Sequence, residues 1–121
     1  MKSTLKRILV VDDDPAILAF VAVMLEDAGY TVVTTDKGEY VEKLHDSGLP
    51  DLIVLDVLLS GKDGREIAKK LKRNEETKHI PILMLSAHPS AEQTALASGA
   101  DDFLAKPFEM DEFLAKVARF F

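Results

Sequence analysis

Five short runs typical of β-strands alternate along this sequence with stretches of helical periodicity. Ile8–Val11, Leu52–Leu55 and Ile82–Leu85 are continuously apolar, as strands covered on both faces must be. Thr31–Thr35 is half polar and Asp102–Ala105 is short, which favours the edges of a sheet. Strands that alternate with helices pair in parallel through right-handed crossovers. The pattern therefore predicts a parallel sheet with three central strands and two edge strands.

The chain order of these runs predicts the order of the strands. Placing the first, third and fourth strands inside and the second and fifth outside gives the doubly wound order 2-1-3-4-5. Apolar residues at Ile17, Val21 and Leu25 repeat as one face of a helix between the first two strands. We expect one α/β domain over residues 1–121, with helices on both faces of a five-stranded sheet. Composition alone does not exclude other strand orders.

The ends of the helices carry their own signals. Asp13 or Asp14 can cap the first helix, with Pro15 in its first turn. A residue that favours a left-handed backbone often closes a helix. Candidates for this role follow four of the helical stretches: Gly29, Gly48, Asn74 and Gly99.

Composition narrows the classes of function. The chain has no cysteine, so disulfides, thiolate metal sites and thiol catalysis are excluded. Its 21 acidic and 15 basic residues give a net charge of −6, which disfavours direct binding to nucleic acid. No apolar run approaches the roughly 20 residues that span a bilayer, so we expect no membrane insertion. The apolar residues after Met1–Arg7 are too few for a signal peptide, and the expected compartment is the cytoplasm.

Polar residues stand where the predicted strands end. Ligands of a doubly wound sheet bind beyond the carboxyl ends of its strands, near the switch point between strands one and three. The residues that follow strands one, three, four and five are Asp12–Asp14, Asp56, Ser86 and Lys106. Each has an ordinary explanation as a turn, a helix cap or a surface lysine. Their convergence on one edge favours a site instead.

Converging carboxylates repel one another and cannot all ionise without neutralisation. Lys106 supplies one positive charge, and a divalent cation would supply the rest. Mg²⁺ suits carboxylates that leave room for water and a phosphoryl oxygen. An aspartate beside Mg²⁺ and a lysine has the parts for nucleophilic attack on phosphorus.

The motifs at these strand ends, taken together, resemble those of response-regulator receiver domains of the chemotaxis-regulator, CheY-like type. The resemblance covers essentially the whole chain and implies the flavodoxin-like (βα)5 three-layer sandwich. The matching segments are Val10–Asp14, Leu55–Asp56 with Asp63–Gly64, Leu85–Ala87 and Phe103–Phe108.

The resemblance implies a role for each acidic residue. Asp56 would accept a phosphoryl group from the phosphohistidine of a sensor histidine kinase or phosphotransfer protein, or from a small acyl phosphate. Asp12 and Asp13 would hold Mg²⁺, or Mn²⁺ as a substitute, together with Asp56. The backbone carbonyl of Leu58 would be a further metal ligand.

Three further residues receive roles by the same resemblance. Ser86 would bind a phosphoryl oxygen, and Lys106 would pair with the phosphorylated aspartate. Phe103 would be the aromatic switch residue that turns inward when Ser86 moves. The peptide bond between Lys106 and Pro107 is expected to be cis.

The implied function is a signalling switch of a two-component system. The domain would catalyse only its own phosphorylation and slow dephosphorylation. Its output would pass through the fourth helix, fifth strand and fifth helix to a downstream protein or effector domain. The residues leave open the cognate kinase, the oligomeric state and whether the receiver stands alone or comes from a longer regulator.

Three other functions are compatible with parts of this pattern. A Mg²⁺-dependent phosphohydrolase commonly has a second acid two residues after its nucleophile, where this chain has Leu58. A flavin-binding module needs a phosphate loop after the first strand, where this chain has acids. A degenerate receiver would bind partners without phosphorylation, but here all the motif positions are filled.

The chain departs from the family's usual residues in the loop after Asp56. Ser60 stands where the family often has a proline, and we expect Ser60–Gly61 to leave this loop looser. Apolar Leu58 would hinder water and prolong the phosphorylated state. Further along, Pro89–Ser98 has little apolar surface to bury and is expected to be a weakly held helix.

Overall fold

The computed structural model describes residues 6–44 and 48–121. Its main sheet has the order β2-β1-β3-β6-β7 with every neighbouring pair parallel, which confirms the predicted doubly wound order. These strands are β1 (Arg7–Val11), β2 (Thr31–Thr35), β3 (Leu52–Asp56), β6 (Ile82–Ser86) and β7 (Asp102–Ala105). The helices are α1 (Pro15–Asp27), α2 (Gly38–Glu42), α3 (Gly64–Arg73), α4 (Glu92–Ala97) and α5 (Met110–Ala118), with a 3₁₀ turn, η2 (Pro89–Ala91), before α4.

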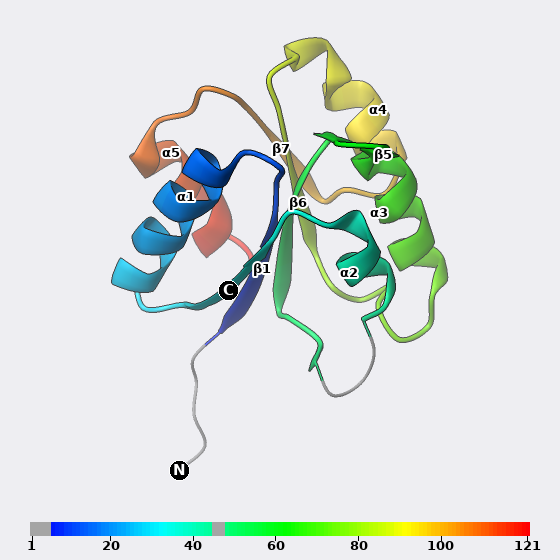
Figure 1. Cartoon of the computed structure of the whole chain (residues 1–121), viewed down its shortest axis with the longest axis horizontal. Helices are drawn as coiled ribbons and strands as arrows, with labels where there is room; N and C mark the ends of the chain where they lie inside the picture. Colours follow the sequence, from blue (N-terminus) through cyan, green and yellow to red (C-terminus); the bar gives the residue numbers. More distant parts are fainter. Residues whose placement is uncertain (1–5, 45–47) are drawn as a thin grey trace.

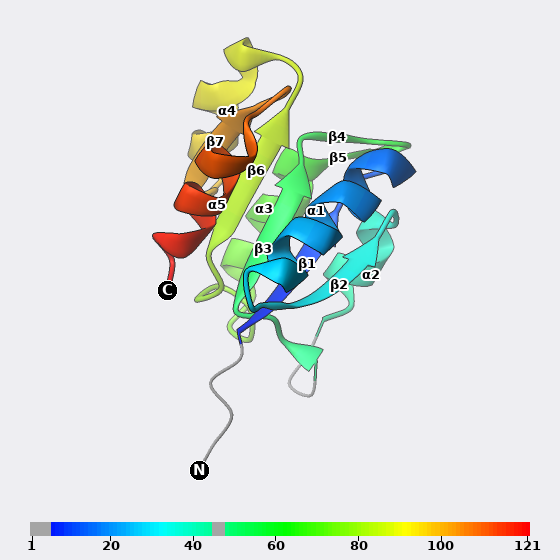
Figure 2. The same ribbon diagram turned by 90° about the vertical axis from the view of Figure 1, so that its left-hand side faces the viewer.

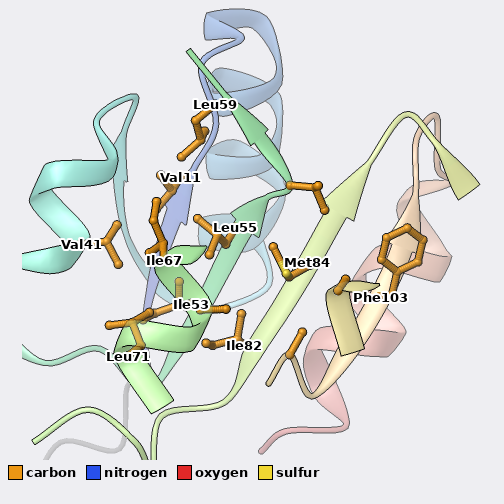
Figure 3. Close-up of a cluster of buried hydrophobic side chains, with 14 of the residues drawn as sticks. Val11, Val41, Ile53, Leu55, Leu59, Ile67, Leu71, Ile82, Met84 and Phe103 are labelled. Atoms are coloured by element: carbon orange, nitrogen blue, oxygen red, sulfur yellow. The ribbon is translucent and has the colours of Figure 1, made fainter. Parts of the chain in front are cut away.

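The helices form two layers, with α1 and α5 on one face of the sheet and α2, α3 and α4 on the other (Figures 1 and 2). Alternate residues of β1 belong to different apolar clusters. Ile8 and Val10 pack on the side of α1 and α5, and Leu9 and Val11 pack on the side of α2 and α3. Figure 3 shows the second cluster, in which Phe103 lies at the end near α4. The three-layer sandwich is therefore confirmed. None of the described helices is long and apolar enough to cross a membrane.

The predicted helix ends are largely confirmed. Asp14 caps α1, and its carboxylate accepts hydrogen bonds from the backbone N–H groups of residues 16 and 17. Gly29 and Gly99 have φ values of 103° and 112°, in the left-handed region that glycine favours. The prediction for Asn74 is wrong, because Asn74 leaves α3 with extended backbone (φ −90°, ψ 125°) and not in a left-handed conformation. The predicted helix end at Gly48 adjoins residues 45–47, which lie outside the described residues.

A small antiparallel hairpin follows β3 and was not predicted. Its strands are β4 (Leu58–Leu59) and β5 (Lys62–Asp63), joined by Ser60 and Gly61. Gly61 has a φ of 74°, whereas Ser60 has no positive φ. A turn of type II combines these two conformations, with glycine favoured at its third position. Only Val57 separates the hairpin from the end of β3, so the hairpin lies at the edge where the predicted site residues collect.

Helix α4 buries little apolar surface, as the sequence predicted. Ala95 is its only buried residue, and η2 before it buries only Ala91. A short helix with so little buried apolar surface lies at the low-stability end of a fold.

We predict that Gly64→Ala destabilises the protein by about 1–3 kcal/mol, because its Cβ would overlap the backbone carbonyl oxygen of Asp56. Urea denaturation would measure the change. Gly48→Ala is the matched control, since nothing lies within 4 Å of its Cβ. Equal denaturation midpoints for the two variants would contradict the close approach of α3 to β3.

Candidate functional site

The carboxyl ends of four parallel strands place the predicted site residues together. Asp12 follows β1, Asp56 ends β3, Ser86 ends β6 and Lys106 follows β7. The register aligns these ends, because Val11 pairs with Leu55 and Asp56 pairs with Leu85. The sheet itself therefore brings side chains from opposite ends of the sequence to one edge.

Lys106 is the cation at the centre of this edge. Its Nζ donates a hydrogen bond to Oδ2 of Asp12 at 2.7 Å and lies 3.3 Å from Oδ1 of Asp56. Both carboxyl groups are buried, with relative exposures of 0% for Asp12 and 7% for Asp56. Burial strengthens such ion pairs but also makes each unpaired charge costly. A single ammonium group therefore serves two buried carboxylates.

Asp13 completes a cluster of three carboxyl groups. One oxygen from each of Asp12, Asp13 and Asp56 lies within 4.8 Å of the others. Both oxygens of Asp12 accept hydrogen bonds, Oδ2 from Lys106 and Oδ1 from the backbone N–H of Asp14 at 3.0 Å. Three ionised carboxylates and one lysine leave a net charge of −2. Hard oxygen donors with unneutralised negative charge fit a small divalent cation such as Mg²⁺.

The cluster raises the pKa of both Asp56 and Lys106, which disfavours the charged form of the carboxyl group and favours that of the ammonium. Burial, reinforced by the charge of Asp12, raises the pKa of Asp56 from 3.8 to about 6, although Lys106 opposes the rise. Burial alone would lower the pKa of Lys106, but its hydrogen bond to Asp12 and the charge of Asp56 raise it above the ordinary value. Lys106 thus stays protonated, and Asp56 is mostly ionised at neutral pH.

The other predicted residues surround this cluster. Ser86 is buried, and its Oγ accepts a hydrogen bond from the backbone N–H of His88 at 3.0 Å. Leu58 is 51% exposed and lines a hollow of about 220 Å³ together with Ser86 and His88. The Lys106–Pro107 peptide bond is cis, as the resemblance implied.

Phe103 is directed inward in this structure. It is 6% exposed and belongs to the apolar cluster that also contains Met84 and Ala95 (Figure 3). Since Ala95 is the buried residue of α4, the ring of Phe103 packs in the same apolar cluster as this helix.

Sequence reasoning missed the contacts of the β4–β5 hairpin and of the start of α3. Ser60 donates two hydrogen bonds to Asp13, so these bonds restrain the loop that we expected to be looser. Arg65 forms a fork with the carboxylate of Asp63 and donates from Nη1 to Oγ1 of Thr94 in α4 at 2.9 Å. Only the turn residues near Gly61 hinted at the hairpin, and no local signal indicated either long-range contact.

Comparisons with known proteins agree on one family. Residues 8–118 match the response regulator receiver domain family. The chain is 44% identical over 113 residues to the DNA-binding dual master transcriptional regulator RpaA of Synechocystis, covering 92% of this chain and 47% of that protein. It is 42% identical over 114 residues to the alkaline phosphatase synthesis transcriptional regulatory protein PhoP of Bacillus subtilis, covering 93% and 47% respectively. The chain thus spans about half the length of the curated relatives it matches.

Solved structures show the same similarity. A putative response regulator from Chloroflexus aurantiacus superposes with a TM-score of 0.90 at 36% identity, covering 97% of this chain and 98% of that one. The chemotaxis protein CheY4 of Vibrio cholerae gives 0.88 at 32% identity, covering 98% and 100%. The response regulator TrrA of Thermotoga maritima, solved in complex with Mg²⁺ and BeF, gives 0.86 at 33% identity, covering 97% and 100%.

We predict that Asp56→Asn becomes progressively more stable than the unmodified chain as pH rises from about 4 to about 7 without divalent cations. Because the pKa of Asp56 is higher when folded, the folded protein binds more protons than the unfolded chain between pH 3.8 and about 6. The unmodified chain loses stability across that window, by up to about 3 kcal/mol, and the amide cannot.

Urea denaturation in a chelating buffer at several pH values would measure the difference. Asp27→Asn, which replaces an exposed carboxyl group at the end of α1, is the control. A stability difference that does not change with pH would contradict the raised pKa.

Proposed function

This chain belongs to the family of response regulator receiver domains, and we propose that it is a phosphorylation-activated switch whose acceptor is Asp56. The observation that carries the proposal is Lys106 placed between Asp12 and Asp56, with Asp13 beside them. We propose the phosphohistidine of a sensor histidine kinase or phosphotransfer protein as the donor. A small acyl phosphate is a chemical substitute for it.

The three carboxylates would hold Mg²⁺, or Mn²⁺ in its place, with the backbone carbonyl of Leu58 as a further ligand. When bound, the cation supplies positive charge for the phosphoryl oxygens. The proximity of three hard oxygen donors supports this assignment. The Mg²⁺ and BeF complex of TrrA supports it by similarity.

Each nearby side chain has a part in the proposed transfer. A carboxylate oxygen of Asp56 attacks phosphorus, an O–P bond forms, and the N–P bond of the donor breaks with its electron pair going to the imidazole. The ammonium of Lys106 balances charge on the acceptor and the transferred group. The hydroxyl of Ser86 donates a hydrogen bond to a phosphoryl oxygen. A pKa of about 6 for Asp56 leaves the attacking carboxylate largely ionised at pH 7.

We further propose that the signal leaves through α4, β7 and α5. Ser86, Phe103 and Lys106 adjoin this side, since β6 pairs with β7 and Phe103 shares a cluster with Ala95 of α4. Phosphorylation replaces the Asp56 charge by a phosphoryl group of about −1.5 to −2, by analogy with other phosphorylated side chains. That change would bias the equilibrium between two arrangements of α4.

The downstream partner would be a protein or an attached effector domain. Several relatives are named as transcriptional regulators, and the chain covers about half of each. The net charge of −6 argues against DNA binding by the receiver itself.

Asp56 should gain one phosphoryl group when the protein is incubated with acetyl phosphate and Mg²⁺. The measurement is intact mass, and the added group should be absent in Asp56→Asn and without the cation. A folded, Mg²⁺-bound protein that gives neither the adduct nor a beryllium fluoride complex would contradict the proposal.

Replacing Leu58 by Asn should speed loss of the phosphoryl group, since the exposed apolar side chain lies at the mouth of the site and hinders water. Phosphate release after removal of the donor would measure the rate. Val23→Asn, which replaces an exposed apolar residue on α1, is the matched control. An unchanged lifetime in Leu58→Asn would refute the role of Leu58.

A further inference from the structure

Ser60 makes two hydrogen bonds to a single oxygen of Asp13. Its backbone N–H lies 3.0 Å from Oδ2 of Asp13, and its Oγ lies 2.7 Å from the same atom. The two residues are 47 positions apart in the sequence, so the bonds join the tip of the β4–β5 hairpin to the loop after β1. Both donors of Ser60 therefore bind Oδ2 of Asp13, and neither binds Oδ1.

The two hydrogen bonds from Ser60 matter for Asp13 because, unlike Asp12 and Asp56, it has no ion pair among the described residues. Asp12 and Asp56 share the ammonium of Lys106. Among the ion pairs of the described residues, none involves Asp13. Asp13 is also exposed, so packing restrains its side chain little. The two hydrogen bonds from Ser60 are thus the polar contacts that restrain this carboxylate among the described residues.

The backbone of the hairpin does not by itself require serine at this position. Ser60 is the second residue of a turn whose third residue, Gly61, has a φ of 74°. Proline is common at the second position of such a type II turn. A proline there would form the turn but would have neither the N–H nor the hydroxyl that contact Asp13. The serine therefore adds an interaction that the turn does not need.

We propose that Ser60 is a positioning residue for the divalent cation of this site. It holds Oδ2 of Asp13 and so fixes the orientation of a carboxylate that would be a metal ligand. Carboxylates that bind metals are commonly oriented by such outer hydrogen bonds. The same two bonds join the β4–β5 hairpin, which contains Leu58, to Asp13 of the cluster. This inference rests on the proposed function, because it presumes that the three carboxylates bind Mg²⁺.

Competition between Ser60 and the metal for Asp13 would change the Mg²⁺ affinity in the opposite direction. If the cation required Oδ2 of Asp13, the two hydrogen bonds would have to break on binding. Ser60 would then compete with Mg²⁺, and removing its hydroxyl would strengthen binding. The sign of the change in Mg²⁺ affinity therefore separates positioning from competition.

Isothermal titration calorimetry of the full chain with MgCl₂ tests the proposal, and no phosphoryl donor is needed. Ser60→Ala, which keeps the N–H and loses the hydroxyl, should weaken Mg²⁺ binding roughly threefold to tenfold. Ser60→Pro, which loses both donors, should weaken it by about tenfold to a hundredfold. Ser60→Thr, which keeps both, should bind as the unmodified chain does. Thr31→Ala removes an exposed hydroxyl at the amino end of β2, the end of that strand away from the site, and serves as the control.

A second measurement distinguishes positioning from general damage to the fold. The rate of phosphorylation by acetyl phosphate should fall in Ser60→Ala at low Mg²⁺ and recover at saturating Mg²⁺. Its unfolding midpoint without Mg²⁺ should stay close to that of the unmodified chain. A rate that stays low at saturating Mg²⁺ would contradict a role limited to holding the ligand.

Two results would overturn the inference and are distinguishable from each other. Unchanged or tighter Mg²⁺ binding in Ser60→Ala and Ser60→Pro, with normal binding in the unmodified chain, would overturn the role of Ser60 alone. Absence of Mg²⁺ binding in the folded unmodified chain would overturn the metal site of the proposed function together with it.

Discussion

The ion pairs of Lys106 with Asp12 and Asp56 are the interactions on which the arrangement of this edge depends. They are possible only because β1, β3 and β7 end at the same level of a parallel sheet. Burying two carboxylates and one ammonium is costly unless the partners are well placed. One cation nevertheless cannot neutralise three neighbouring acids. The remaining negative charge is a local cost to stability, and a bound divalent cation would offset it.

Most of the fold could be predicted because the sequence expresses it locally. Apolar runs such as Leu52–Leu55 show that both faces of a strand are covered, and half-polar Thr31–Thr35 shows an edge. Parallel pairing then places whatever follows each strand at a common edge. This is why Asp12, Asp56 and Lys106, which are far apart in the chain, could be assigned to one cluster from the sequence alone.

The features that were not predicted leave no recognisable pattern in the local sequence. Two-residue strands such as Leu58–Leu59 show no periodicity, and only their pairing defines them. The contacts of Ser60 with Asp13 and of Arg65 with Thr94 join residue types that are common on any surface. Asn74 suits both left-handed and extended backbone; here it is extended, and its side-chain oxygen accepts a hydrogen bond from the backbone N–H of Glu76 in the following turn. Prediction thus failed for contacts that join residues distant in the sequence and of types common on any protein surface.

The separation of Lys106 from Asp12 by 94 positions has a consequence for the newly made protein. Asp56 leaves the ribosome 50 residues before the lysine that balances it. Until β7 has been added to the sheet, the acids near Asp56 have no ammonium partner, and a partly synthesised chain lacks the assembled edge. This edge is therefore assembled only in the completed fold, and a chain that ends before Lys106 lacks the ammonium group that pairs with Asp12 and Asp56.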